Sequence, residues 1–288
     1  MADRRRKSIL DFNTMKKQGE KVVWITSYDY PTASFAEKAG VDMILVGDSL
    51  GMCIYGYQST VPVTMDQCIW HSECVRRAAP NTYVIGDMPF MSYQRCVEDA
   101  VENAGRFHKE AAVDAIKLEG GKRVVPQVRA ILDAGMVVCG HIGLTPQSTG
   151  QFGGYKAQGR TAESGAEMVA DAMALAEAGI QLLLLEAITP PVAKYITELL
   201  PIPVFSIGAG VDCDGQLLIV SDLIGEFQAF TPKFVKKYAN VAEVMTNAIS
   251  EYATEVRSGA FPTDAHTYKM IDGEYEKFLA LAGKLGPA

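Results

Sequence analysis

Short, continuously apolar segments recur along this 288-residue chain and constrain its fold more than any other feature of the sequence. The segments are rich in aliphatic and β-branched residues, which is typical of strands that are covered on both faces. Seven segments are clear, and an eighth near the C-terminal third is weaker. The predicted strands are residues 22–28, 43–46, 83–86, 115–118, 137–140, 182–185, 204–207 and 227–230.

Helical patterns separate these segments. Over residues 162–178, for example, apolar side chains fall on one face, and Gly179 follows as a residue that commonly ends a helix. Alternating strands and helices predict parallel pairing with right-handed crossovers. Eight such units in a chain of this length favour an α/β fold closed into a (β/α)8 TIM barrel, and an open doubly wound sheet is the alternative.

Both ends of the chain carry additional helical patterns. Residues 8–19 predict an extra N-terminal helix whose apolar side chains suit the bottom of a barrel. Residues 274–285 predict a second helix, within a helical tail at about residues 269–288 that packs on its own barrel or on a neighbouring subunit. The chain shows no linker or low-complexity stretch, so residues 1–288 are expected to form a single domain.

Composition narrows the class of function. The net charge of -7 and the pI near 5.2 argue against a nucleic-acid partner, because tracking phosphates requires a basic face. No apolar run approaches the length of a membrane span, so no membrane partner is expected. The six cysteines have no Cys-x-x-Cys spacing and follow no secretory signal. These features predict a cytoplasmic protein that acts on small molecules.

Ionisable side chains stand at the ends of the predicted strands. In a barrel these ends converge on one mouth, so the side chains are expected to face a common space. They are Asp48, Asp87, Lys117, Glu119, His141 and Glu186.

Each of these acidic residues has a structural alternative, because a carboxylate after a strand often caps the next helix. Asp48, however, precedes a glycine-containing loop, and Asp87 precedes Met88-Pro89-Phe90 rather than a helix start. For Lys117 the alternative is an ion pair with the nearby Glu119. Helix capping does not require acidic residues, a lysine and a histidine together at separate strand ends, so the whole set indicates a functional site.

The residue types suggest a metal-assisted reaction. Mg²⁺ prefers carboxylate oxygens and keeps positions open, so Asp48 and Asp87 could hold it while a 2-oxo acid chelates it. Charge stabilisation at the keto oxygen would then make an adjacent carbon-bound proton more acidic, with a stabilised enolate as the result. Glu186 is the candidate general base that removes this proton.

The two basic side chains have roles consistent with this chemistry. His141 could donate to an oxyanion or carboxylate, and Lys117 could attract an anionic substrate. A sharper alternative makes Lys117 a Schiff-base nucleophile, as in barrel aldolases. That alternative ranks lower, because a metal held by Asp48 and Asp87 makes an imine redundant as the electron sink.

Two glycine-containing segments complete the pattern. Gly208-Ala209-Gly210 lacks the third glycine of a dinucleotide fingerprint and is interpreted as a tight turn after the seventh strand. Residues 144–160 are expected to form a long loop at the barrel mouth, where such loops often cover the substrate.

Six motifs, in order along the chain, resemble those of the ketopantoate hydroxymethyltransferase family. The resemblance runs from about Ile25 to about Pro262. The motifs are Val46-Gly-Asp-Ser-Leu-Gly-Met52, Ser59-Thr-Val-Pro-Val-Thr64, Asp87-Met-Pro-Phe-Met91, Lys117-Leu-Glu-Gly-Gly121, Gly140-His-Ile-Gly-Leu-Thr-Pro-Gln147 and Gly153-Gly-Tyr-Lys156 through Arg160.

The resemblance implies a barrel of the phosphoenolpyruvate/pyruvate superfamily and one transfer reaction. In it, 3-methyl-2-oxobutanoate (2-oxoisovalerate) receives a hydroxymethyl group from the cosubstrate 5,10-methylenetetrahydrofolate to give ketopantoate, a step in pantothenate and coenzyme A biosynthesis. It also implies a homodecamer.

The same resemblance implies a role for each site residue. Asp48 and Asp87 match Mg²⁺ ligands, Glu119 matches an acidic residue near the metal, and Glu186 matches the general base. Ser49, Lys117 and His141 match residues that bind the oxo acid, which Asp48 and Asp87 contact through the metal.

Two other hypotheses stay open on the sequence. The barrel could belong to a carbon–carbon lyase or a phosphoenolpyruvate mutase relative, which share enolate chemistry in the same superfamily. It could also be a non-catalytic scaffold, which would assemble tightly without turnover.

Overall fold

The computed structural model describes residues 5–284 and 286, and the chain divides into two compact units, Met1–Ala239 and Asn240–Ala288. We call them the barrel unit and the tail unit. The expectation of a single domain over residues 1–288 stays a prediction.

The barrel unit contains eight parallel strands that close into a barrel in sequence order, with β8 pairing to β1. The predicted closed barrel is therefore confirmed, and the open sheet is excluded. The strands are β1 (Val22–Thr26), β2 (Met43–Val46), β3 (Tyr83–Asp87), β4 (Ala115–Glu119), β5 (Val138–Gly143), β6 (Leu182–Glu186), β7 (Val204–Ile207) and β8 (Gly215–Leu218).

The prediction of the eighth strand at residues 227–230 is wrong. Strand β8 lies earlier, at Gly215–Leu218, and pairs with both β7 and β1. It is only four residues long and begins at a glycine, and its short apolar run, Leu217–Val220, continues past the strand into α10. Phe227 and Phe230, which suggested a strand, instead pack edge to face, with ring centroids 5.5 Å apart.

The strand register sets the ionisable side chains side by side. Asp87 on β3 pairs with Lys117 on β4, and Glu119 on β4 pairs with His141 on β5. Glu186 ends β6 opposite Gly143. Neighbouring residues in a parallel register point to the same side of the sheet, so one rim of the barrel collects these groups.

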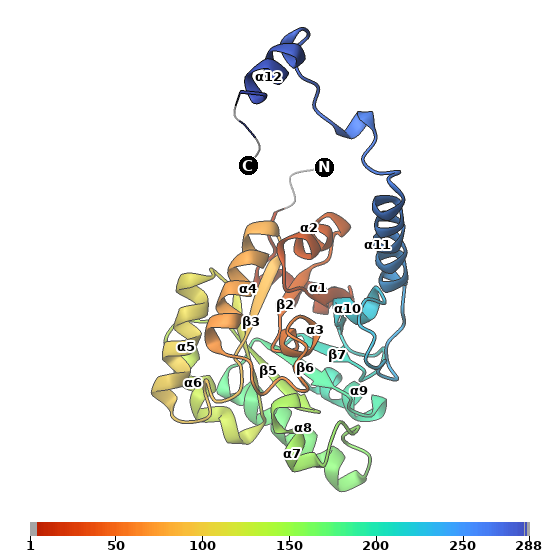
Figure 1. The fold of residues 1–288 in the computed structure, drawn as a ribbon. Coiled ribbons are helices and arrows are strands. Elements are labelled where there is room, and N and C mark those ends of the chain that lie inside the picture. The colour runs from red at the N-terminus through yellow and green to blue at the C-terminus, as the bar shows by residue number, and fades with distance from the viewer. Residues whose placement is uncertain (1–4, 285, 287–288) are drawn as a thin grey trace. The chain divides into compact units, whose positions relative to one another are not determined.

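Helices surround the strands of the barrel unit (Figure 1). Helix α8 has the predicted bounds, because the Thr161 hydroxyl caps its first turn and Gly179 ends it with φ of 104°. The helices of this unit are α1 (Ile9–Gln18), α2 (Tyr30–Ala39), α3 (Leu50–Cys53), α4 (Met65–Ala78), α5 (Val97–Glu110), α6 (Val125–Asp133), α7 (Thr149–Phe152), α8 (Ala162–Ala178), α9 (Pro190–Leu199) and α10 (Val220–Leu223), with short 3-10 helices at Lys122–Val124 and Pro146–Ser148.

The predicted N-terminal helix corresponds to α1, which contributes to the core inside the barrel. Its Phe12 and Met15 are buried in the cluster of inward-facing strand side chains. The Phe12 ring meets the Tyr83 ring edge to face, with centroids 5.1 Å apart. A second, larger cluster fills the layer between strands and outer helices. The two layers together hold the strand ends in fixed positions.

The tail unit contains α11 (Val241–Ser258), a 3-10 helix at Asp264–His266 and α12 (Glu274–Ala282). Helix α12 begins at the predicted residue, and the predicted end, Leu285, lies outside the described residues. None of the described residues of α11 and α12 is buried. Among the helices that the structure describes, none is long and apolar enough to cross a membrane.

Candidate active site

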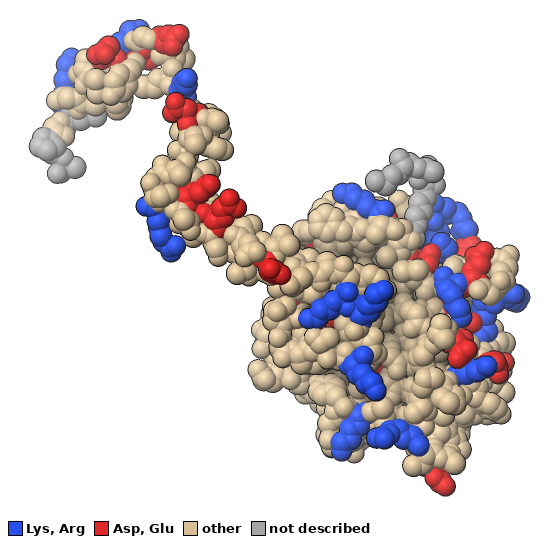
Figure 2. Space-filling model, turned by 90° about the vertical axis from the view of Figure 1, so that its right-hand side faces the viewer, with Lys and Arg blue, Asp and Glu red and all other residues tan. Residues whose placement is uncertain are grey.

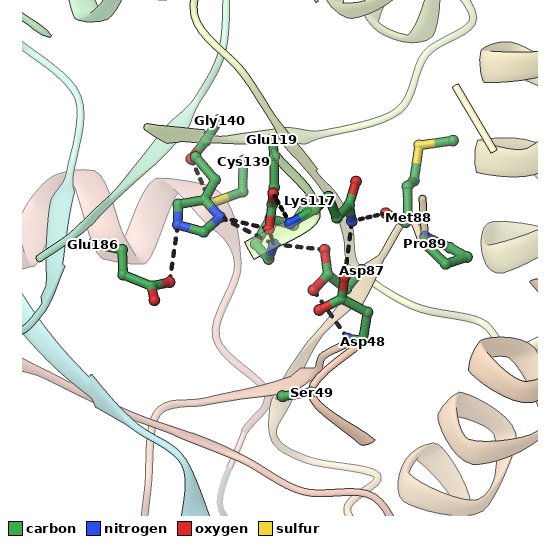
Figure 3. Close-up of polar contacts among 12 residues, drawn as sticks. Asp48, Ser49, Asp87, Met88, Pro89, Lys117, Glu119, Cys139, Gly140 and Glu186 are labelled. Carbon is green, nitrogen blue, oxygen red and sulfur yellow. Dashed lines mark hydrogen bonds and ion pairs between the residues drawn. The ribbon is translucent and has the colours of Figure 1, made fainter. Parts of the chain in front are cut away.

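All seven side chains predicted to form the site line one cavity of about 420 Å³ at the C-terminal ends of the strands. Five of them are almost completely buried, and the Glu186 side chain is 15% exposed. The contacts among six of them, all except Ser49, form one continuous network in Figure 3. The seven are Asp48, Ser49, Asp87, Lys117, Glu119, His141 and Glu186.

Lys117 lies at the centre of the charged network. Its Nζ is 2.6 Å from Asp87 Oδ1 and 3.9 Å from Glu119 Oε1. Burial alone would lower the pKa of Lys117, but the surrounding carboxylates of Asp87, Glu119 and Asp48 outweigh it and raise the pKa. A Schiff-base nucleophile needs a free amine, so this environment disfavours the aldolase alternative. The expected ion pair with Glu119 exists but is the longer of the two.

Three buried carboxyl groups share this one ammonium group among the described residues. Burial, and then repulsion from Asp87 and Glu119, raises the pKa of Asp48 well above its usual range. Burial also raises the pKa of Asp87 and of Glu119, while Lys117 offsets part of each shift. When all three carboxyl groups are ionised, two negative charges are left uncompensated, which is costly in a low-dielectric interior.

This charge excess and the donor set fit a divalent cation. Asp48 and Asp87 offer carboxylate oxygens from neighbouring strands, and the Asp48 N–H donates to Asp87 Oδ2 over 3.1 Å, which holds the two residues together. Among the described residues, no group of three or more His, Cys, Asp or Glu side chains is arranged to hold a metal ion. Mg²⁺ commonly takes only one or two protein carboxylates and fills its remaining positions with water and substrate.

Gln147 is a structural member of the site that the sequence analysis did not single out. Its side-chain amide donates to Asp48 Oδ2 and to the Met88 carbonyl, both over 2.9 Å. Its backbone N–H donates to Glu119 Oε2 over 3.1 Å, and its Oε1 accepts from the Tyr93 hydroxyl over 2.9 Å. Gln147 is the last residue of the motif that begins at Gly140, and its place in that motif was the signal in the sequence that could have identified it.

Tyr93 fixes the end of strand β4. Its hydroxyl accepts from the Glu119 N–H over 3.0 Å and lies 3.0 Å from the Glu119 carbonyl oxygen. The side chain is 1% exposed, so this anchor lies in the core. Tyr93 and Gln147 therefore fix the positions of Glu119 and Asp48 through buried hydrogen bonds.

His141 connects the charged network to Glu186. Its Nδ1 lies 3.3 Å from Lys117 Nζ and 3.5 Å from Glu119 Oε1, and its Nε2 lies 3.2 Å from Glu186 Oε2. Burial, together with the charge of Lys117, lowers the pKa of His141. The ring is therefore neutral at neutral pH. Figure 3 shows the Glu186 carboxylate pointing toward this ring.

Glycine geometry at the end of β5 places Glu186. Gly143 has φ of 99°, and a Cβ on it would stand 2.3 Å from the carbonyl oxygen of Glu186. Ala187, directly after Glu186, also has a positive φ, of 49°. The backbone therefore turns sharply where the carboxylate enters the cavity.

Ser49 lies apart from the charged network (Figure 3). Its hydroxyl is 2.8 Å from the Tyr28 hydroxyl, and it lines the cavity next to Asp48. It therefore offers a neutral hydrogen-bonding group beside the carboxylates.

The predicted covering loop contains short helical pieces, α7 and the 3-10 helix at Pro146–Ser148. Tyr155, Lys156 and Ala157 from this loop line the cavity. A second wall of the cavity comes from the segment after β8 and includes Asp222, to which the sequence analysis gave no role.

The sequence is similar to a family of known enzymes. The family model described as ketopantoate hydroxymethyltransferase matches residues 6–264. A protein named 3-methyl-2-oxobutanoate hydroxymethyltransferase from Alkaliphilus metalliredigens is 62% identical over 272 residues, which cover 94% of this chain and 96% of that protein. A protein of the same name from Moorella thermoacetica is 54% identical over 269 residues, covering 93% and 100%.

Solved structures with low sequence identity share the fold. A 2,3-dimethylmalate lyase, described as a PEP mutase/isocitrate lyase superfamily member, has a TM-score of 0.59 at 17% identity, covering 96% of this chain and 99% of that one. A phosphonopyruvate hydrolase in complex with oxalate and Mg²⁺ has a TM-score of 0.59 at 14% identity, covering 96% of each chain. These likenesses agree with the closed parallel barrel of this chain.

Proposed function

Because this chain belongs to the ketopantoate hydroxymethyltransferase family, we propose that it transfers a hydroxymethyl group from 5,10-methylenetetrahydrofolate to 3-methyl-2-oxobutanoate, forming ketopantoate. The chain is an enzyme of the transferase class, and the proposed product places it in pantothenate and coenzyme A biosynthesis. The observation that carries the proposal is the convergence of buried carboxylates, Lys117 and Glu186 on one cavity.

Substrate binding follows from the charges and donors in the cavity. An oxo acid is an anion with a keto group, so it offers only acceptors to the protein. Lys117 and Ser49 supply hydrogen-bond donors in the cavity wall, and the buried ammonium of Lys117 attracts the negative charge of the oxo acid. We assign oxo-acid binding to these residues and to His141.

Asp48 and Asp87 would hold Mg²⁺, with Glu119 beside it. When bound, this cation stabilises the negative charge that develops on the keto oxygen. Gln147 keeps Asp48 oriented, and Lys117 keeps Asp87 oriented. The site is therefore built before the substrate arrives, which is the condition for strong electrostatic stabilisation.

Glu186 is the proposed general base. Its carboxylate reaches the cavity and is partly open to it, whereas the other three carboxylates are enclosed in the charged network. It would take the proton from C3 of the oxo acid, and C3 would bond to the methylene carbon of the donor. The two bonds from that carbon to folate nitrogens break, water supplies the hydroxyl oxygen, and tetrahydrofolate leaves with the proton from C3 and one proton from water on those nitrogens. Neutral His141 keeps the Glu186 carboxylate in place through the 3.2 Å contact.

One incubation tests the proposal. The protein, Mg²⁺, 3-methyl-2-oxobutanoate and methylenetetrahydrofolate are combined with and without a chelator, and products are analysed by mass spectrometry. We expect ketopantoate only in the sample without chelator. Cleavage of oxaloacetate-like substrates or turnover of phosphonates, without ketopantoate, would favour the lyase or mutase hypothesis. No turnover of any substrate would favour the scaffold hypothesis.

The tail unit supports the proposed homo-oligomer. Helix α11 exposes a row of apolar side chains at helical spacing, Met245, Ile249, Tyr252 and Val256, and much of the surface of this unit is uncharged in Figure 2. Such a face is more stable when another surface covers it. Sedimentation velocity should give a mass several times that of one chain, and Ile249→Glu should shift it toward smaller species. A monomeric wild-type protein would exclude the homodecamer that the resemblance implies.

A cytoplasmic location is also part of the proposal. All six cysteines are free, and three of them are buried, which suits a reducing compartment. Cell fractionation with an antibody against the chain tests this location. Small molecules are the proposed partners, and the expected absence of nucleic-acid and membrane partners stays a prediction.

A further inference from the structure

One part of the cavity wall has a different chemical character from the charged network. The charged network occupies one part of the wall, while the segment after β8 contributes Phe227, Phe230 and Phe234 to another. Phe227 and Phe230 meet edge to face. A Cβ on Gly208 would stand 2.5 Å from the Phe234 ring, so that ring lies directly on the turn after β7. The Gly208–Gly210 turn thus has a role in shaping an aromatic wall.

Asp222 brings a carboxylate to this aromatic wall. The residue lines the cavity and is only 4% exposed. Among the described residues, no hydrogen bond or ion pair to its side chain is present, although the charge of Lys237 acts on it. Burial raises the pKa of Asp222 to about 6. An unpaired buried carboxylate is costly, so its presence in a cavity points to a ligand that donates to it.

A further polar atom faces the same cavity without a partner. The Thr60 hydroxyl lies in the cavity wall, is buried, and has no hydrogen-bond partner among the residues that the structure describes. The cavity therefore offers more hydrogen-bonding capacity than the charged network uses.

The oxo acid cannot satisfy Asp222. It carries a carboxylate and a keto oxygen, both acceptors, and a second carboxylate repels it. A suitable ligand is flat and conjugated, so that it packs against phenylalanine rings, and has adjacent N–H donors at one edge. The aminopyrimidine edge of a pterin has this form, because its ring N–H and amino group can donate side by side to the two oxygens of one carboxylate.

We propose that Asp222 binds the aminopyrimidine edge of the pterin of the folate donor, with the pterin ring packed against the Phe227, Phe230 and Phe234 wall. This inference rests on the proposed function, since it assumes a folate donor. It assigns different parts of one cavity wall to the two substrates: the anionic oxo acid to Lys117 and the pterin to Asp222.

The test is Asp222→Asn in the full-length protein, with Glu226→Gln as the matched control. Glu226 is exposed, lies four residues farther along the same segment, and does not line the cavity. The Asp222 variant should raise the Kd for tetrahydrofolate, measured by calorimetry, and the KM for methylenetetrahydrofolate by roughly 10- to 100-fold. The KM for 3-methyl-2-oxobutanoate should change far less, and the control should resemble wild type. Equal changes in both KM values, or none, would overturn the inference.

A measurement on the wild-type protein keeps the inference testable if Asp222→Asn does not fold. A tetrahydrofolate analogue that lacks the 2-amino group should bind roughly 10-fold or more weakly than tetrahydrofolate. In a folded Asp222 variant, the two ligands should bind almost equally. Equal binding to wild type would refute the role of Asp222. If wild type forms no ketopantoate at all, the proposed function fails instead.

Discussion

His141 Nε2 lies 3.2 Å from Glu186 Oε2, on the opposite side of the ring from the Lys117 ammonium, which is 3.3 Å from Nδ1. An ammonium can only donate, so Nδ1 of the neutral ring must accept from it. The single ring proton is then on Nε2 and faces the Glu186 carboxylate. The charged network thus determines the tautomer of His141. The Nε2–H of the ring faces Glu186, so the Glu186 carboxylate is the acceptor in this contact.

Glu186→Gln should abolish exchange of the C3 proton of 3-methyl-2-oxobutanoate in heavy water, because an amide cannot accept that proton. We expect the exchange rate to fall by about 10²- to 10⁴-fold, followed by proton NMR. Mg²⁺ binding should persist. Glu198→Gln, on the exposed side of α9, is the control and should exchange like wild type. Undiminished exchange in the Glu186 variant would remove Glu186 from the role of base.

Asp48→Asn should weaken Mg²⁺ binding strongly while stabilising the metal-free protein. The change removes one of three carboxylates that burial and mutual repulsion make costly, and an asparagine oxygen can still accept from Gln147. We expect the free energy of unfolding without metal to rise by about 1 kcal/mol. Calorimetric titration with Mg²⁺ and denaturant unfolding measure the two effects. Asp133→Asn, at an exposed position, controls for the charge change; unchanged Mg²⁺ affinity in the Asp48 variant would contradict the metal assignment.

Gln147→Ala should lower both stability and activity. The substitution removes the donor to Asp48 and the acceptor for Tyr93, and it leaves buried groups unpaired. We expect a loss of about 1 to 3 kcal/mol in the free energy of unfolding. Weaker Mg²⁺ binding should accompany it, because Asp48 loses its orientation. A variant with wild-type stability and Mg²⁺ affinity would show that Gln147 merely fills space.

Gly143→Ala should be severely destabilising, by more than about 2 kcal/mol, because the new Cβ meets the Glu186 carbonyl at a positive φ. Gly105→Ala is the matched substitution. Gly105 lies inside α5 with open space around it, so its change should stabilise the protein by about 0.5 to 1 kcal/mol. Thermal unfolding of both variants measures these effects. Similar small shifts in both would argue against a constrained β5 end.

Asp222 makes stability depend on pH. Its folded-state pKa of about 6 exceeds the usual aspartate value, so the folded protein holds this proton more tightly than the unfolded chain. Stability contributed by that proton is present at low pH and is lost as the pH rises through the folded-state pKa. Asp222→Asn should therefore stabilise the protein at pH 7.5, by at most about 3 kcal/mol, and hardly at pH 4. Urea unfolding at both pH values measures the difference, and an equal gain at both would contradict the shift.

The sequence predicted those parts of the site that follow directly from strand position. A carboxylate or lysine at the end of a buried parallel strand reaches the barrel mouth whatever conformation the loops adopt, so the positions of Asp87, Lys117 and Glu119 follow from the sequence alone. Periodicity likewise predicted α8, because its cap and its terminal glycine are both local signals.

The parts that failed depend on contacts distant in sequence. Strand β8 is short and starts at a glycine, its apolar run continues into α10, and the prediction took the aromatic segment after it as the strand instead. That one error concealed Asp222, which lies four residues after the true end of β8 and would otherwise have joined the other strand-end carboxylates. The role of Gln147 depends on how residues 144–148 fold back over Asp48, which is 99 positions away.

The three enclosed carboxylates belong to Asp48, Asp87 and Glu119. They stand at the ends of β2, β3 and β4 or within two residues of them, and these strands are neighbours in the closed barrel. A cation held among them would therefore join strands that must separate when the barrel opens. Unfolding would require release of that cation first, so the lifetime of the folded barrel should lengthen as free magnesium rises. The cation would then determine the lifetime of the folded enzyme as well as its reaction.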